Sequence, residues 1–392
     1  MERRSFLHIS AAGSILGASA SHAQEPQDEE AKAPGIPVAM APRPDGIEII
    51  WRTHQLARGM VEFGPTPELG STKRDDGWGL RPAGSESIRV RLDGLQPGTT
   101  YHYRTVTESM DKKDASRSVS AIRTFRTLDP AASATRFAVW NDTHKHADTI
   151  KKLAELTPPS DFLLWNGDIC NDWYREGEVA DTILTPAGGI DHSANHPLLL
   201  VRGNHDVRGT LAHQVEDHAP MPDGKPWFAI RSGPVTAICL DTGEDKPDDH
   251  PYLFGRAACE PMRQAQAEWL EQTITRPEFA NAPYRIVFCH IPLRWTDETT
   301  DHGYDWYSKR SRDLWHDSLV KWGAQLVISG HTHRDAHIRS NDRFPYQQLV
   351  GGGPKHAQAR LITAQADKSK LAIRMTDLDG KQVRALDLPA LV

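Results

Sequence analysis

The stretch Phe162-Leu-Leu-Trp-Asn-Gly-Asp168 is a short apolar run that ends in a carboxylate, and similar runs recur along the chain. Such runs, bounded by polar residues, are typical of buried strands in an α/β sheet. The five runs with the residues that follow them are Phe137–Trp140 with Asp142 and His144, Phe162–Trp165 with Asp168, Leu198–Val201 with Asn204, Ile286–Phe288 with His290, and Leu326–Ile328 with His331 and His333. Because α/β sheets place their sites at the carboxyl ends of strands, we expect these side chains to share one edge.

Length and charge limit the classes of protein that this chain can be. With 392 residues it exceeds one typical domain, so two domains are expected. Lys plus Arg total 46 against 52 Asp plus Glu, which gives a formal net charge of -6. This balance argues against nucleic acid as a general partner.

The N-terminus resembles a twin-arginine export signal, because Arg3 and Arg4 precede a mildly apolar stretch, Ile9 to Ala20. Glu2 and His8 depart from the usual signal, which leaves the ordinary secretion route open. Residues 1–23 are predicted to be the signal, and 24–34 a flexible tether rich in polar residues. A bilayer needs about 20 apolar residues, so no stable membrane insertion is expected. The predicted location is the periplasm.

Residues 35–128 are predicted to form an all-β sandwich. Short runs alternate with period two between Gly and Pro turns, as in Gly46–Trp51 and Ser87–Leu92. The stretch from Leu92 to Tyr103 resembles the corner before a late strand of a fibronectin type III domain, with Tyr101 in the tyrosine-corner position. Residues 129–134 are small and are predicted to be a linker.

From residue 135 to 392, strand-like runs alternate with helical spacing, which indicates an α/β domain. The predicted helices are His146 to Leu156, Ala265 to Ile274 and Arg312 to Trp322. The four cysteines form no Cys-x-x-Cys pair, so buried free thiols are favoured over a disulfide or a thiolate metal site.

The seven polar residues at the strand ends suit two metal ions. A two-metal phosphoester site needs carboxylates and imidazoles around cations about 3.5 to 4 Å apart, with one carboxylate able to bridge them. Mixed nitrogen and oxygen donors without thiolate are compatible with Fe, Zn, Mn or Co. Gly203 and Gly330 precede two of the clusters, where a missing Cβ allows close approach. The chain has 19 histidines, and those without such a pattern are expected to be structural or exposed.

The order and spacing of the clusters resemble the calcineurin-like metallophosphoesterase family over about residues 135–392. The resemblance implies a four-layer αββα fold with two bound metal ions. It assigns Asp142, His144, Asp168 and His333 to one ion, and Asp168, Asn204, His290 and His331 to the other, with Asp168 as the bridge. It also implies that His205 stabilises the transition state or protonates the leaving oxygen, and that Asp206 orients His205.

Two residues near the clusters are candidate substrate contacts. Arg208 is a candidate because a guanidinium suits phosphate oxygens, the alternative being a surface arginine. Asn171 lies in the loop after Asp168 and is the second candidate, with turn formation as its alternative.

A sandwich followed by a phosphoesterase domain also resembles purple acid phosphatases, but two positions differ. The first cluster of those enzymes has Asp-x-Gly, and a tyrosine stands three residues after the bridging aspartate. Here His144 and Asn171 occupy these positions. We therefore expect iron-loaded protein to lack the tyrosinate charge-transfer colour.

The resemblance implies an enzyme that hydrolyses small phosphorylated substrates by attack of a metal-bridging hydroxide, and the N-terminal signal implies that this enzyme is exported. Monoesters are favoured, with diesters as the alternative. A second alternative is a non-catalytic envelope binding protein on the same scaffold. Segments Pro247–Tyr252 and Asp297–Trp306 are candidate pocket walls. The oligomeric state is left open.

Overall fold

Two mixed β-sheets packed face to face carry the polar clusters, and helices cover their outer faces. The computed structural model describes residues 34–74, 86–109, 116–253, 255–295 and 303–391. The predicted signal, most of the predicted tether and the start of the Asp297–Trp306 segment lie outside these residues. In the described part of the chain, no helix is both long and apolar enough to cross a membrane.

The first sheet has nine strands in the described chain. In spatial order they are β20 (Gln382–Pro389), β19 (Lys370–Thr376), β18 (Leu361–Ala366), β9 (Thr135–Trp140), β10 (Phe162–Asn166), β11 (Leu198–Val201), β1 (Val38–Met40), β2 (Gly46–Arg52) and β5 (Ser87–Asp93). Strands β9, β10 and β11 are parallel neighbours, with Trp165 in register with both Trp140 and Leu200. Their carboxyl ends therefore meet at one edge.

The second sheet has six strands in the described chain. In spatial order they are β12 (Phe228–Ser232), β13 (Val235–Leu240), β14 (Tyr284–Cys289), β15 (Leu326–Ser329), β17 (Gln347–Val350) and β16 (Ala336–Ile338). Strands β13, β14, β15 and β17 are parallel neighbours. Phe137 of the first sheet meets Phe288 of the second edge to face, with ring centroids 5.7 Å apart.

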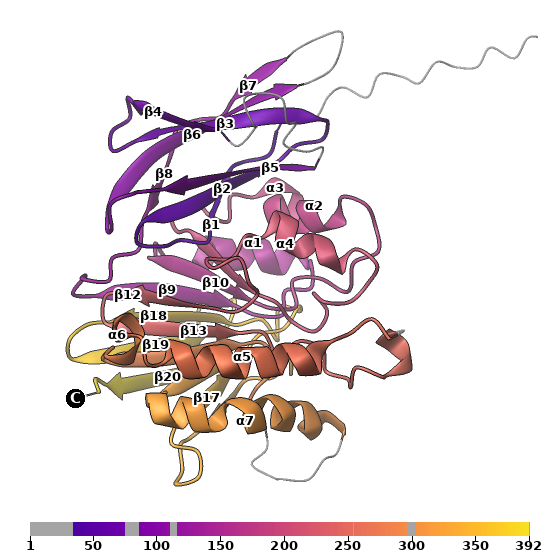
Figure 1. Cartoon of the computed structure of the whole chain (residues 1–392), viewed down its shortest axis with the longest axis vertical. Coiled ribbons are helices and arrows are strands. Elements are labelled where there is room, and N and C mark those ends of the chain that lie inside the picture. The colour runs from indigo at the N-terminus through magenta and orange to yellow at the C-terminus, as the bar shows by residue number, and fades with distance from the viewer. Residues whose placement is uncertain (1–33, 75–85, 110–115, 254, 296–302, 392) are drawn as a thin grey trace, which may run out of the picture. The chain divides into compact units, whose positions relative to one another are not determined.

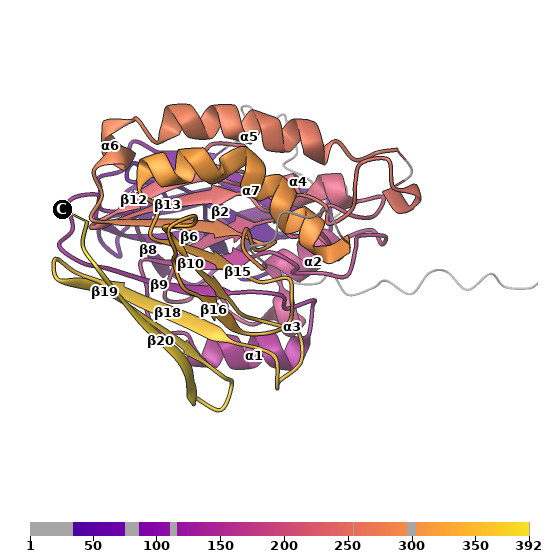
Figure 2. The same cartoon turned by 90° about the horizontal axis from the view of Figure 1, so that it is seen from below.

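Helices complete the layers, as Figure 2 shows. Buried residues of α1 (Ala147–Leu156) and α2 (Glu178–Leu184) join the core of the first sheet, while α5 (Cys259–Thr273) and α7 (Gly303–Trp322) join that of the second. The short helices are α3 (Pro186–Gly189), α4 (Val215–His218) and α6 (Pro277–Ala280), with 3-10 turns at Ala212–Gln214 and Pro251–Leu253. The predicted four-layer α/β architecture is confirmed.

The N-terminal part forms the predicted β structure, and one of its sheets continues into the first sheet (Figure 1). Strand β1 pairs with β11 in parallel, with Met40 opposite Leu198. The other sheet contains β4 (Ser71–Arg74), β3 (Ala57–Gly64), β6 (Thr100–Ser109) and β7 (Arg117–Val119), and β8 (Arg123–Arg126) pairs with β6. Residues 33–392 form one compact unit. The predicted domain boundaries stay predictions, because the sheet crosses them.

Two smaller expectations concern local packing. The Tyr101 hydroxyl accepts a hydrogen bond from the Gln96 backbone N–H at 3.0 Å, which is the bond that a tyrosine corner requires. The fibronectin type III resemblance itself stays a prediction. All four cysteines are free and buried, as expected from their apolar surroundings.

Candidate metal centre

The five predicted clusters converge at the carboxyl ends of β9, β10, β11, β14 and β15. Backbone hydrogen bonds continue beyond the strand ends and hold the loops together. The Asp142 N–H donates to the Gly167 carbonyl at 3.1 Å, and the His144 N–H donates to the Asp168 carbonyl at 2.9 Å. In the second sheet, the Gly330 N–H donates to the His290 carbonyl at 3.0 Å. Sheet pairing and these loop bonds therefore position the side chains of the clusters.

Most of the predicted ligands have an unusual backbone. Asp142, His144, Asp168, His331 and His333 have φ between +44° and +70°. This region is uncommon for residues other than glycine, and it concentrates at functional sites where the surroundings hold the strain. The sharp turns end each strand abruptly and direct the next side chain over the sheet edge.

One group of side chains gathers Asp142, His144 and His333, whose ligand atoms lie within 4.8 Å of one another. The Nε2 atoms of the two imidazoles are 3.1 Å apart, and His333 Nε2 is 3.6 Å from Asp142 Oδ1. Two imidazole nitrogens facing each other beside a carboxylate form a donor set that suits a metal ion.

A second group gathers Asp168, His290 and His331. His290 Nε2 is 3.2 Å from Asp168 Oδ2, and Asn204 Oδ1 is 2.8 Å from His331 Nδ1. Asp168 Oδ2 is also 3.5 Å from His144 Nε2, which belongs to the first group. The structure thus brings all seven predicted ligands together and places Asp168 between the two groups, as a bridging carboxylate requires.

Glycine is required where the clusters pack most tightly. A Cβ on Gly330 would lie 2.2 Å from Asp142 Oδ2, and one on Gly203 would lie 2.2 Å from Asp168 Oδ1. Either contact would displace a carboxylate, so the predicted close approach is present at both positions.

The donor chemistry fits a cation. Burial raises the pKa of Asp142 to about 7, and the neighbouring Asp168 charge adds to the effect. Burial also opposes ionisation of Asp168, but the adjacent His290 outweighs it and holds the pKa of Asp168 below its usual range. Burial opposes the His290 imidazolium too, yet the Asp168 and Asp142 carboxylates raise the pKa of His290 to about 10. The acids thus hold positive charge at this position, where a metal could replace the proton.

The orientation of His290 supports this fit. Its Nδ1 lies 2.9 Å from the Asn166 carbonyl, so Nδ1 carries the proton in that hydrogen bond and Nε2 faces the two acids. Burial lowers the pKa of His144 to about 4 and that of His331 to about 3. Both imidazoles are therefore neutral near pH 7, which is the form that binds metal.

His205 lies beside the ligands, but its partner differs from the prediction. Its Nδ1 is 2.7 Å from Asp172 Oδ1. Burial works against the charged ring, yet this hydrogen bond outweighs it and raises the pKa of His205. The two oxygens of Asp206 instead accept hydrogen bonds from the Ile169 and Gly203 N–H groups at 3.1 and 2.8 Å. The acid that contacts the His205 side chain is therefore Asp172, whereas Asp206 faces the backbone, and the orienting role itself stays a prediction.

The two candidate substrate contacts have protein partners. Arg208 donates from Nε to Glu244 at 2.6 Å and from Nη2 to Asp245 at 2.6 Å, while its Nη1 lies 3.3 Å from His205 Nε2. Asn171 Oδ1 is 2.7 Å from His144 Nδ1. Arg208 thus lies against His205, where its charge opposes protonation of the ring and works to lower its pKa, and Asn171 contacts a predicted ligand. Their contact with substrate stays a prediction.

Sequence reasoning missed Glu244 and Asn166. Glu244 follows the apolar run of β13, so the rule used for the five clusters could have found it. Asn166 Nδ2 donates to Asn141 Oδ1 at 2.9 Å and to the Cys289 and Ile328 carbonyls at 3.3 Å each, which ties the two sheets beneath the site. No local signal distinguishes an amide with this role from a turn residue.

Residues 135–335, just over half of the chain, match the calcineurin-like phosphoesterase family. The chain belongs to this family. It is 26% identical over 191 residues to the serine/threonine-protein phosphatase CPPED1 of Mus musculus, covering 48% of this chain and 58% of that protein. It is 24% identical over 326 residues to purple acid phosphatase 15 of Arabidopsis thaliana, covering 76% of this chain and 57% of that protein. The chain thus spans somewhat over half the length of these curated relatives.

Solved structures agree on the fold. The purple acid phosphatase PPD1 from yellow lupin (Lupinus luteus) seeds superposes with a TM-score of 0.66 at 14% identity, covering 91% of this chain and 74% of that one. The structure of PhoD superposes with a TM-score of 0.63 at 12% identity, covering 89% of this chain and 91% of that one. The nearest tyrosine after Asp168 here is Tyr174, whose residue is 57% exposed.

Proposed function

We propose that the chain is a binuclear metal-dependent phosphoesterase that hydrolyses phosphate monoesters. The observation that carries the proposal is the position of Asp168 between two groups of imidazole and oxygen donors. Two cations in such a site activate a water, position the ester and neutralise charge on the phosphoryl oxygens.

The residues around the donors have separate tasks. Asp142 and Asp168 supply the negative charge that holds cations, and Asn166 keeps His290 turned toward them. His205 lies within the group that contains Asp168 and His144, where it can give a proton to the leaving oxygen. Asp172 fixes the ring of His205 and favours its protonated form.

The preference for monoesters is supported by the curated relatives, which are named as phosphatases. The test is a panel of aryl phosphate monoesters and diesters, assayed with the full chain loaded with Mn, Zn, Fe or Co. We expect higher kcat/KM for monoesters. Faster turnover of diesters would reverse the preference, and absence of hydrolysis with every metal would contradict the proposed function and favour a binding protein.

We also propose export to the periplasm, supported by the arginine pair and the small residues before Gln24. Mass spectrometry of the protein from cell fractions should find a periplasmic form that begins at Gln24. Replacement of Arg3 and Arg4 by lysine should reduce this form if the twin-arginine route is used. Recovery of the uncleaved chain in the cytoplasm alone would contradict export.

A further inference from the structure

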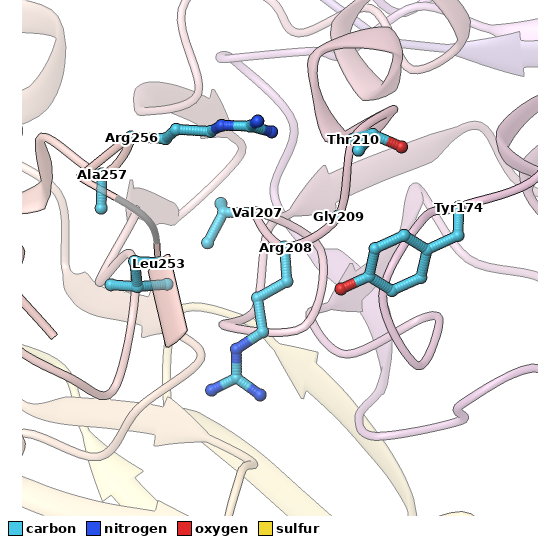
Figure 3. A pocket seen from close by; sticks show the side chains of 8 residues that line it. All are labelled: Tyr174, Val207, Arg208, Gly209, Thr210, Leu253, Arg256 and Ala257. Atoms are coloured by element: carbon cyan, nitrogen blue, oxygen red, sulfur yellow. The ribbon is translucent and has the colours of Figure 1, made fainter. Parts of the chain in front are cut away.

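A pocket is lined in part by the loops that follow Asp168 and His205, and in part by the segment from Leu253 to Ala257. It has a volume of about 120 Å³, and it is lined by Tyr174, Val207, Arg208, Gly209, Thr210, Leu253, Arg256 and Ala257. Tyr174 follows the loop of Asp168, and Val207 to Thr210 continue from His205. Figure 3 shows these side chains.

Arg208 connects this pocket to the reacting centre. Arg208 is one of the lining residues, and its guanidinium Nη1, which points away from Arg256 and Thr210 in Figure 3, lies 3.3 Å from His205 Nε2. A group held in the pocket therefore lies on the side of His205, the residue proposed to protonate the leaving oxygen. This places the pocket where the leaving group of an ester, rather than its phosphoryl group, would bind.

Backbone hydrogen bonds hold two of the pocket walls in register. The Trp173 N–H donates to the Arg208 carbonyl at 3.0 Å, and the Leu211 N–H donates to the Trp173 carbonyl at 3.1 Å. The Trp173 indole N–H also donates to the Asp206 carbonyl at 3.0 Å. These bonds tie the loop after Asp168 to the loop after Asn204, so this side of the pocket is preorganised.

The lining residues indicate the chemistry of the occupant. Val207, Leu253 and Ala257 provide apolar surface, Tyr174 and Thr210 provide hydroxyl groups, and none of the lining residues is acidic. Arg208 is already engaged by Glu244 and Asp245, but in the described part of the chain no ion pair involves Arg256. In Figure 3 the Arg256 guanidinium extends toward Thr210, whereas the Arg208 guanidinium points away from both residues. Arg256 is therefore the cation that this pocket offers to a ligand.

We propose that this pocket binds the leaving group of the substrate, and that this group is a compact body of about one ring bearing an anionic substituent that Arg256 binds. The volume of about 120 Å³ sets an upper limit on the size, since an apolar cavity of about 150 Å³ accommodates benzene and this pocket is smaller. This inference rests on the proposed hydrolysis of monoesters. It adds a preference for leaving groups with an anionic substituent, which the metal centre alone would not produce.

The test compares two phenyl phosphates that differ only at the para position, one with a carboxylate and one with a carboxamide. The carboxamide is nearly isosteric and neutral, and its phenol is the better leaving group. We expect the metal-loaded full chain to have about tenfold higher kcat/KM for the carboxylate, because a charge-assisted hydrogen bond forms with Arg256. Arg256→Gln should abolish this preference by lowering the rate for the carboxylate more than that for the carboxamide, and Arg256→Lys should restore part of it.

The matched control is Arg334→Gln, which removes the same charge from an exposed arginine next to His333, outside the pocket lining. This variant should keep the preference. Equal rates for the two esters in the unchanged protein, a preference that survives Arg256→Gln, or an equal loss in Arg334→Gln would each overturn the inference.

A binding measurement separates this inference from the proposed function. The corresponding benzylphosphonates cannot be hydrolysed, and their Kd values can be measured by calorimetry on the metal-loaded chain. We expect about tenfold tighter binding of the carboxylate, lost in Arg256→Gln. If neither ester is hydrolysed but this difference is found, the proposed function fails and the pocket assignment stands. Equal Kd values contradict the pocket assignment whether or not the esters are hydrolysed.

Discussion

Charged side chains are arranged differently in two regions of the molecule. One region is the joint, where the N-terminal β structure meets the rest of the chain, and the other is the metal-site edge, where the candidate metal ligands lie. At the joint, acids pair with arginines. Arg52 Nε is 2.6 Å from Asp181, and Arg123 reaches both oxygens of Asp191 at 2.6 and 2.7 Å. At the metal-site edge, buried carboxylates instead share their surroundings with several imidazoles. Paired charges stabilise packing, whereas convergent donors with shifted pKa values indicate a ligand site.

The largest predicted difference appears when one acid is neutralised in each region, because only the substitution at the metal-site edge should affect metal binding and activity. Asp168→Asn should lose metal and reduce kcat/KM on the order of 10³-fold or more, because the shared donor is weakened for both ions. Elemental analysis and initial rates measure the two effects. The matched change at the joint, Asp191→Asn, should keep both metal and activity. Similar loss of metal in the two variants would show that the comparison is wrong.

A smaller effect is expected at His205, which lies beside the donors without being a predicted ligand. His205→Gln should lower kcat by about 10² to 10⁴ while metal content stays unchanged, since a proton donor is removed. Asp172→Asn should lower kcat less, because the imidazole remains but loses its orienting partner.

Asp206→Asn tests the prediction, made from the sequence, that Asp206 orients His205. If it lowers kcat more than Asp172→Asn does, with metal content and stability intact, Asp172 is not the orienting residue.

At the joint, substitution should affect stability and leave catalysis unchanged. The Arg123 side chain is 16% exposed and that of Asp191 is 31% exposed. Arg123→Ala should therefore reduce the free energy of unfolding by about 1 to 2 kcal/mol, with kcat unchanged. Arg91→Ala provides the control, because it removes an ion pair in which both side chains are 51% exposed, and such pairs contribute little. Thermal melts of both variants give the difference. Equal losses of stability in the two variants would show that the ion pair at the joint stabilises the fold no more than an exposed pair does.

The smallest predicted effect is a pH dependence away from the metal site. Burial lowers the pKa of His192 to about 4, against about 6.5 in the unfolded chain. The unfolded state binds more protons between these values, so stability present above pH 6.5 is lost as the pH falls toward 4. His192→Phe keeps a ring beside Trp165. The Tm of this variant should fall less between pH 7.5 and 5 than the Tm of the unchanged protein. An identical loss would show that His192 does not titrate in this range.

Sequence alone predicted the strands and the seven converging donors, because apolar runs that end in polar residues report the carboxyl ends of parallel strands directly. The helices were also predictable in part. Spacing indicated Ala265 to Ile274, whereas α5 begins at Cys259, where the mixed first turn Cys-Glu-Pro-Met has no clear periodicity.

The rest could not be predicted because it depends on contacts between distant segments. The pairing of Met40 with Leu198 joins the N-terminal strands to the main sheet across a long stretch of sequence. The choice between Asp172 and Asp206 as the partner of His205 depends on loop geometry. The nearer acid in sequence, Asp206, turns inward to backbone N–H groups, and only the folded loops show this.

The most direct test is a titration of metal into the metal-free full chain, with bound metal and the rate of aryl phosphate hydrolysis measured at each step. We predict that activity rises until two ions are bound per chain, and that Asp168→Asn shows neither the binding nor the rise. Full activity at one ion per chain, or binding of two ions without any hydrolysis, would contradict a binuclear phosphoesterase.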